Sequence, residues 1–256
     1  MSLAIVGGVA ALLVAASLGY VVGRSGAPSA QASPAVTSAP TSAPTPVASG
    51  TLGPAIGTQG AVLAPGDNHV TAGSLTTNCS TLVSASDGGD CGSVNAGTTK
   101  VIWTVDGQPT LGSAGDLAVH LFTYSTDSGG WVEQMSAGGG SWQSIKVVAA
   151  DLTGDGNDEL LVGYRSPAEA DKLEVDIVGF AQDGTPEILA HLDAATKGSI
   201  VIVGKAVTSY AAQYPNGEAV CCPPSYEESV IVFEAGSFRV AQTINVAPSA
   251  VPRSVL

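Results

Sequence analysis

The stretch that decides the fold is Asp151-Leu-Thr-Gly-Asp-Gly-Asn-Asp-Glu-Leu160, an acidic loop that continues into the apolar segment Leu161-Val-Gly-Tyr164. Oxygen donors recur at loop positions 1, 3, 5, 7 and 9, on Asp151, Thr153, Asp155, the backbone carbonyl of Asn157, and Glu159. This spacing suits a hard cation such as Ca²⁺, which collects six to eight oxygen ligands at about 2.3–2.6 Å. We therefore predict a calcium site followed by a strand.

Crowded charge is a second argument for a metal ion in this loop. Its carboxylates would repel one another in a tight turn that held no counter-ion. The alternative is an Asp/Gly-rich turn that joins two strands and binds nothing. Five protein donors nearly fill a calcium shell, so we expect the ion to stiffen the turn rather than to bridge to a ligand.

Residues 147–163 resemble the calcium loop of FG-GAP/VCBS-type repeats, which occur in integrin-like propellers and in bacterial surface proteins. That family's pattern is a strand, then D-x-[NDT]-G-D-G-x-x-[DE]-[LI], then a second strand. The resemblance implies metal-ligand roles for Asp151, Thr153, Asp155, Asn157 and Glu159. Thr153 replaces the commoner Asn or Asp, and the motif occurs once, whereas propellers consist of several blades. The resemblance thus implies a calcium-loop β-hairpin and does not extend to a complete propeller.

Short β-branched runs bounded by turn residues dominate the chain after residue 50, and no 3.6-residue apolar period appears there. We expect a mainly β fold of antiparallel sheets, arranged as a sandwich, a partial barrel or two to three propeller-like sheets. Residues 51–98 contain few strong strand runs, so we expect a loosely structured β lead-in. The expected strands after it include residues 100–105, 117–124, 131–135, 173–180, 187–192, 199–203, 207–214, 229–233 and 237–243.

The 256 residues divide into four parts. Leu3–Val22 is a twenty-residue uncharged run, long enough to cross a bilayer core of about 30 Å as a helix, so residues 1–24 are expected to be a transmembrane signal anchor. Residues 25–50, rich in Pro, Ser, Thr and Ala, are expected to be a disordered stalk. Residues 51–247 are expected to form the β domain and residues 248–256 a disordered tail. Cleavage near Ala32 is an alternative that would release a secreted protein.

The signals for topology conflict. Arg24, directly after the apolar run, favours a cytoplasmic location for everything that follows. Four cysteines without metal-site spacing, the stalk and the calcium loop favour an oxidising exterior. We expect a single-pass protein of the cell membrane whose globular part is extracytoplasmic.

The charge of the chain limits its partners. It carries 22 acidic residues against nine basic ones, a formal net charge of −13. Nucleic-acid phosphates would be repelled, so we expect no nucleic-acid partner. The N-terminal helix would contact the membrane, and a protein or glycan ligand stays open.

The four cysteines Cys79, Cys91, Cys221 and Cys222 allow three pairings, and we expect two disulfides. Cys79–Cys91 closes a short, glycine-rich loop, but it leaves Cys221 and Cys222 to form a strained ring between neighbours. Each alternative joins residues 79–91 to Cys221 and Cys222 by two long-range bridges. Such bridges close longer loops and therefore stabilise the fold somewhat more. We favour the local pair and leave the alternatives open.

The sequence contains no recognisable catalytic motif. His69, His120 and His191 stand far apart in sequence and form no zinc-type motif, and His120 is expected to be an ordinary strand side chain. Trp103, Trp131 and Trp142 are expected to be core anchors rather than a sugar platform. We therefore expect a non-catalytic domain, stabilised by Ca²⁺ and disulfides, in surface binding or adhesion. The alternative is a hydrolase with glycosidase-like carboxylates, for which Glu227-Glu228 and the pair Asp171 and Glu174 are candidates.

Overall fold

The computed structural model describes residues 52–82, 89–107, 115–167 and 171–256. All of them belong to one compact unit, Val47–Leu256. The expected transmembrane anchor and stalk lie outside the described residues. Within the described ranges, no helix is long and apolar enough to span a bilayer.

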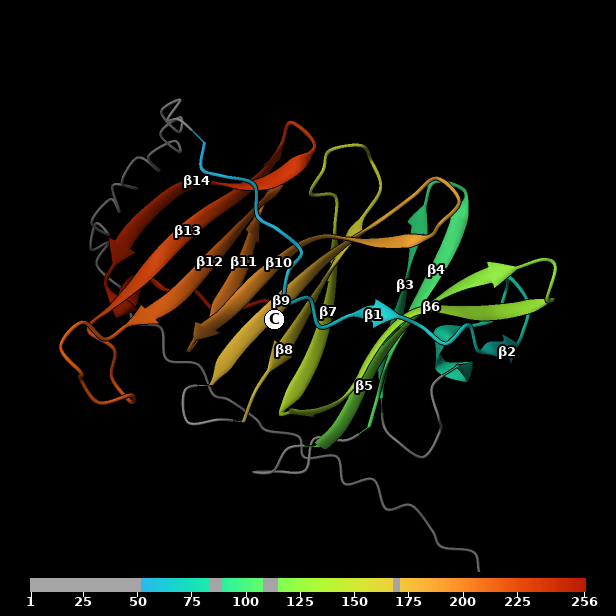
Figure 1. Ribbon diagram of the computed structural model, residues 1–256, viewed down its shortest axis with the longest axis horizontal. Coiled ribbons are helices and arrows are strands. Elements are labelled where there is room, and N and C mark those ends of the chain that lie inside the picture. Colours follow the sequence, from blue (N-terminus) through green and yellow to red (C-terminus); the bar gives the residue numbers. More distant parts are fainter. Residues whose placement is uncertain (1–51, 83–88, 108–114, 168–170) are drawn as a thin grey trace, which may run out of the picture. The chain divides into compact units, whose positions relative to one another are not determined.

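The expectation of a mainly β fold with antiparallel sheets is confirmed (Figure 1). Fourteen strands form three sheets, accompanied in the described residues by the 3-10 turns η1 (Cys79–Thr81) and η2 (Pro248–Ala250). The first sheet contains β1 (Ala64–Pro65), β2 (Val70–Ala72), β3 (Asp90–Ala96), β4 (Thr99–Asp106), β5 (Gly115–Ser125) and β6 (Gly130–Trp142). The middle sheet contains β7 (Ser144–Ala150), β8 (Glu159–Arg165), β9 (Lys172–Phe180) and β10 (Pro186–Thr196). The third contains β11 (Ser199–Val203), β12 (Ala206–Gln213), β13 (Ser225–Glu234) and β14 (Ser237–Val246).

The middle sheet is apolar on both faces, because alternate side chains of one strand point to opposite sides. On β8, Leu160, Val162 and Tyr164 pack with the first sheet, whereas Leu161 packs with the third. Strand β9 divides in the same way, with Val178 on one side and Ile177 on the other. The unbroken apolar run after the acidic loop therefore reflects burial on both faces.

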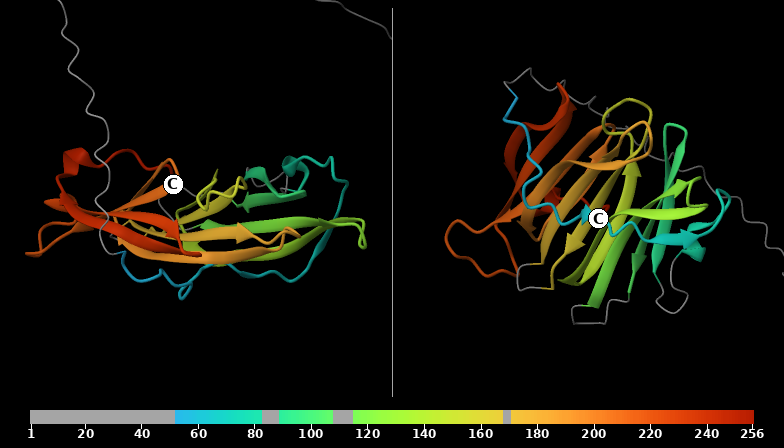
Figure 2. Two further views of the ribbon diagram at one scale, coloured as in Figure 1. Left: turned by 90° about the horizontal axis from the view of Figure 1, so that it is seen from above. Right: turned by 45° about the vertical axis from the view of Figure 1, so that its right-hand side comes forward.

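The lead-in residues 53–65, which we call the strap, cross all three sheets along one side (Figures 1 and 2). Gly53 and Ile56 donate backbone hydrogen bonds to β14, at 2.9 and 2.8 Å. Gly57 then accepts one from His191 on β10 at 2.9 Å, and Ala64–Pro65 pairs with β6. This segment is more ordered than the loosely structured lead-in expected from its sequence, because its backbone groups bond to each sheet in turn.

A buried carboxylate holds the strap against the middle sheet. Oδ2 of Asp176, on β9, accepts the backbone N–H groups of Val62 and Leu63 at 3.0 and 2.8 Å. Its Oδ1 lies 2.7 Å from Nδ1 of His191, and both side chains are buried. Burial, followed by the negative charge of Asp176, raises the pKa of Tyr164. Asp176 thus satisfies backbone donors that would otherwise be buried without partners.

The expectation of a disordered tail at residues 248–256 is wrong. Leu256 is buried between the middle and third sheets, and a Cβ at Gly163 would stand 3.0 Å from its side chain. The backbone of Val255 donates to Ile200 on β11 at 2.8 Å, and Arg165 donates to the Leu256 carbonyl at 3.1 Å. Gly163 leaves the space that the leucine fills, so apolar burial orders the segment.

We predict that Asp176→Asn lowers the free energy of unfolding by about 3 kcal/mol, because a neutral amide loses the charge-assisted hydrogen bonds that the buried carboxylate makes with the strap and with His191. The matched control is Asp193→Asn, since Asp193 is fully exposed and lies 3.9 Å from the other nitrogen of the same histidine. That variant should differ from the parent by less than about 0.5 kcal/mol in urea unfolding. Equal losses in the two variants would contradict the assigned role of Asp176.

Candidate functional site

The acidic loop between β7 and β8 makes the tight turn expected of it. Gly154 and Gly156 adopt φ values of 87° and 90°, a region that favours glycine. Asp151 accepts the N–H of Gly154 at 2.7 Å, and Asp155 accepts the N–H of Asn157 at 2.8 Å. The latter bond is the main reason that the pKa of Asp155 is lowered. The loop is therefore organised by its own hydrogen bonds.

Glu159 lies beneath this loop and is buried. Its Oε2 accepts the N–H groups of Leu152 and Thr153 at 2.7 and 3.0 Å, and its Oε1 accepts the Thr153 hydroxyl at 3.1 Å. Burial raises the pKa of Glu159 above its ordinary value, and the hydrogen bonds offset only part of that rise. The carboxyl group acts as a brace for the start of the loop.

The same loop contacts both neighbouring sheets. Asn157 accepts the N–H of Gly97, in the β3–β4 turn of the first sheet, at 2.9 Å. On the other side, Lys205 in the β11–β12 turn lies 3.5 Å from Asp151. A cavity of about 440 Å³ opens where Asp155 and Asn157 face Gln182 and the residues next to it. The loop is thus a junction of three sheets.

The fit of the loop to calcium is partial. Asp151, Thr153, Asp155 and Asn157 present oxygen donors within one turn, as the chemistry of Ca²⁺ requires. Both oxygens of Glu159 already accept hydrogen bonds from the loop, so Glu159 orients the ligands in this geometry. Nowhere in the described ranges do three or more His, Cys, Asp or Glu side chains form a metal-holding group. Calcium binding here stays a prediction. The two carboxylates of Asp151 and Asp155 would need the Thr153 hydroxyl and the Asn157 carbonyl as further ligands.

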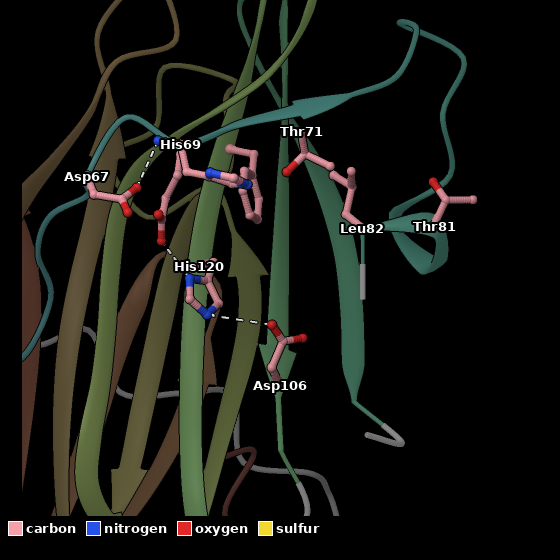
Figure 3. Close-up of a pocket in the computed structure, with 9 residues that line it drawn as sticks. Asp67, His69, Thr71, Thr81, Leu82, Asp106 and His120 are labelled. Carbon is pink, nitrogen blue, oxygen red and sulfur yellow. Dashed lines mark hydrogen bonds and ion pairs between the residues drawn. The ribbon is translucent and has the colours of Figure 1, made fainter. Parts of the chain in front are cut away.

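A second candidate site, which we call the acidic pocket, is a cavity of about 510 Å³ on the outer face of the first sheet (Figure 3). Strands β4, β5 and β6 form its floor, and the segment from residue 67 to η1 covers it. Carboxyl, imidazole and hydroxyl groups converge with two apolar side chains: Asp67, His69, Thr71, Thr81, Leu82, Asp106, His120, Phe122 and Glu133.

His120 lies at the centre of the acidic pocket between two carboxyl groups (Figure 3). Its Nδ1 is 2.5 Å from Oε1 of Glu133 on β6, and its Nε2 is 3.6 Å from Oδ2 of Asp106 on β4. The ring stacks on Phe122 with centroids 6.1 Å apart. Glu133 is buried, so its short contact with the imidazole is only weakly screened by solvent. Both ring nitrogens thus face acceptors.

Asp67 and His69 form the rim of the pocket. The backbone N–H of His69 donates to Asp67 at 2.8 Å, and this bond, followed by a hydrogen-bond interaction with Glu133, lowers the pKa of Asp67. The backbone of Glu133 in turn donates to the His69 carbonyl at 2.9 Å. The strap's continuation is therefore fixed over the sheet by the residues that line the site.

A disulfide fixes the far wall of the pocket. Cys79 in η1 is bonded to Cys91 in β3, with a Cα–Cα distance of 5.7 Å. This is the local pairing, and it holds η1, with Thr81 and the adjoining Leu82, against the sheet. Cys221 and Cys222, which were expected to be bridged, are unpaired and exposed in the structure. The long-range bridges are therefore absent.

The structure separates one of the two carboxylate pairs proposed for a hydrolase and gives a member of the other an ion-pair partner. Glu227 and Glu228 are neighbours on β13, so their side chains point to opposite faces. Asp171 forms an ion pair with Arg165 at 3.2 Å. The tryptophans are core anchors, as predicted: Trp103 and Trp131 are buried in two separate clusters, and Trp142 packs against Tyr164.

Sequence reasoning missed the acidic pocket because its residues come from four separate segments. His69 and His120, far apart in sequence, line one cavity. A signal was present: Asp106, His120 and Glu133 stand at polar positions of otherwise apolar alternating strands. Polar side chains on one face of adjacent strands indicate either a solvent-exposed face or a functional site. The sequence pattern alone does not distinguish the two.

We predict that Glu159→Gln alters the pH dependence of stability in a chelator. Because the folded pKa of Glu159 is raised, the calcium-free parent loses stability as the pH rises from about 4.5 through that pKa. The variant should lack this loss and be the more stable protein at pH 7, since one amide oxygen can accept both N–H groups. It should also gain less from millimolar calcium. Parallel pH profiles of parent and variant in urea unfolding would contradict this account.

Comparisons with known proteins supply no family for the chain. Neither the family models, nor the curated proteins, nor the solved structures contain a match. The resemblance of residues 147–163 to an FG-GAP/VCBS calcium loop therefore stays a prediction.

Proposed function

We propose that this protein is a non-catalytic binding domain, held outside the cell membrane by its N-terminal segment, whose acidic pocket receives a positively charged group of a partner. The observation that carries the proposal is His120, which faces a carboxyl group at each ring nitrogen inside a cavity. A histidine that serves as the base of a nucleophilic triad needs one nitrogen directed at a hydroxyl or thiol. Here both nitrogens are directed at acceptors.

Charge and shape in the pocket favour an amine or guanidinium as the ligand group. Three carboxyl groups, on Asp67, Asp106 and Glu133, stand against two imidazoles. Hydrogen bonds between a cation and an ionised carboxylate are stronger than neutral ones, and salt screens them less at a buried group such as Glu133. Leu82 and Phe122 offer apolar surface on which the aliphatic stem of a lysine or arginine could pack. A basic segment of another protein therefore fits better than a neutral or acidic one.

The three sheets support a finer proposal about architecture. Strands β3–β6, β7–β10 and β11–β14 each form a four-stranded antiparallel meander in chain order. Radially repeated four-stranded sheets are the units of propellers, so we propose a partial, propeller-like stack of three such units. The strap, rather than ring closure, would hold them in register. Calcium at residues 151–159 would stiffen the junction of the three.

A carboxylate hydrolase is the second candidate, favoured by one observation. Asp67 and Glu133 interact closely enough for Glu133 to contribute to the lowered pKa of Asp67. Two carboxyl groups that share a site can divide the roles of acid and base. A glycan or peptide hydrolysed by the parent, and by neither Asp67→Asn nor Glu133→Gln, would replace the binding proposal.

The binding proposal predicts that a blocked tripeptide with a central arginine binds the parent, whereas the same tripeptide with citrulline does not. Glu133→Gln should weaken binding about tenfold or more, because a charge-assisted hydrogen bond is lost. Asp127→Asn is the matched control: it removes the same charge from an exposed turn outside the pocket and should leave Kd within about twofold. Titration calorimetry at several salt concentrations measures each Kd. Equal affinity for arginine and citrulline would contradict the proposal.

A further inference from the structure

Two adjacent cysteines stand in the loop that joins β12 to β13. Cys221 and Cys222 are exposed, and their sulfur atoms are 2.6 Å apart. Two hydrogen bonds shape the loop around them: the Tyr214 hydroxyl donates to the Val220 carbonyl at 2.8 Å, and the Cys222 N–H donates to Ala219 at 3.0 Å. The turn therefore directs both thiols to one side, where a reagent in solution reaches them.

A bond between these two sulfurs would be chemically unlike the bond between Cys79 and Cys91. Neighbouring Cα atoms are about 3.8 Å apart across a trans peptide, short of the roughly 4.4–6.8 Å that disulfides usually span. Cys79 and Cys91 lie within that range, at 5.7 Å. Strained or exposed disulfides are more readily reduced than structural ones. The chain thus contains one disulfide built for stability and one cysteine pair suited to exchange.

We propose that Cys221 and Cys222 are a redox-active pair, which cycles between the dithiol and a vicinal disulfide by exchange with a low-molecular-weight disulfide. The thiolate of one cysteine attacks a sulfur of the reagent R–S–S–R, and one R–S⁻ leaves and takes up the proton. The second cysteine then attacks the mixed disulfide, closes the ring and releases the second R–SH. Two electrons pass from the protein sulfurs to the reagent, and the reverse reaction consumes two thiols.

Groups around the pair act on the Cys222 thiol in opposite directions. Cys221, beside it, raises the pKa of the Cys222 thiol, chiefly through the hydrogen bond between the two sulfurs. Lys197, in the β10–β11 turn, acts in the opposite direction on the same thiol. In the described part of the chain, no third His, Cys, Asp or Glu joins the two sulfurs in a metal-holding group.

The test equilibrates the full chain in buffers with different ratios of reduced to oxidised glutathione, then traps free thiols by alkylation before peptide mass analysis. We expect the 221–222 peptide to lose both alkyl groups under oxidising conditions and to regain them at ratios where Cys79–Cys91 is still intact. The two exchange constants should differ by tenfold or more, about 30 mV. Simultaneous reduction of both pairs, or thiols at 221 and 222 that stay alkylated under every condition, would overturn the proposal.

A single-cysteine variant separates exchange from simple exposure. In Cys222→Ser the resolving thiol is missing, so glutathione should remain attached to Cys221 as a mixed disulfide. In the parent, that adduct should be converted to the ring and fail to accumulate. A parent that accumulates as much adduct as the variant would show that the second cysteine does not resolve it, and would overturn the proposal. A bridge between either cysteine and Cys79 or Cys91 would do the same.

Discussion

The middle sheet is apolar on both faces, and the rest of the structure depends on that constraint. Leu160 and Leu161 are adjacent in sequence, point in opposite directions, and are fully buried. Exposure of either face to water would cost roughly 25 cal/mol per Å² of apolar surface, so the sheet requires a partner on each side. The first and third sheets meet that requirement. The three sheets therefore form a single interdependent stack rather than three separable modules.

Apolar contact alone does not fix how the sheets lie against one another, since hydrophobic burial is not directional. Two sets of polar contacts fix how the sheets lie against one another. Asp176 holds the strap through the N–H groups of Val62 and Leu63, and the acidic loop bonds to Gly97 on one side and faces Lys205 on the other. The acidic pocket depends on the contact between Asp176 and the strap, because the chain that leaves the strap covers the outer face of the first sheet.

The sequence predicted the strands well where an apolar, β-branched run was continuous and bounded by turn residues. Residues 199–203 match β11 in full, and the run after the acidic loop is β8. The strap and the pocket were not predictable in the same way. Asp176 follows Lys172 and Glu174 at the polar positions of an alternating strand. Nothing local indicates that it is buried or that its partners are 113 and 114 positions away. The burial of Leu256 likewise depends on a space left by Gly163 on another strand.

The strap belongs to the core of the stack, although Val62 and Leu63 lie outside every named strand. Native-state hydrogen exchange of individual amides tests this directly. We predict that the amides of Val62 and Leu63 exchange as slowly as those of Leu161 and Ile177, because both sets require opening of the whole stack. Exchange of the two strap amides as fast as the amides of Asn216 and Gly217 in an exposed turn, with the middle sheet still protected, would contradict this role of the strap.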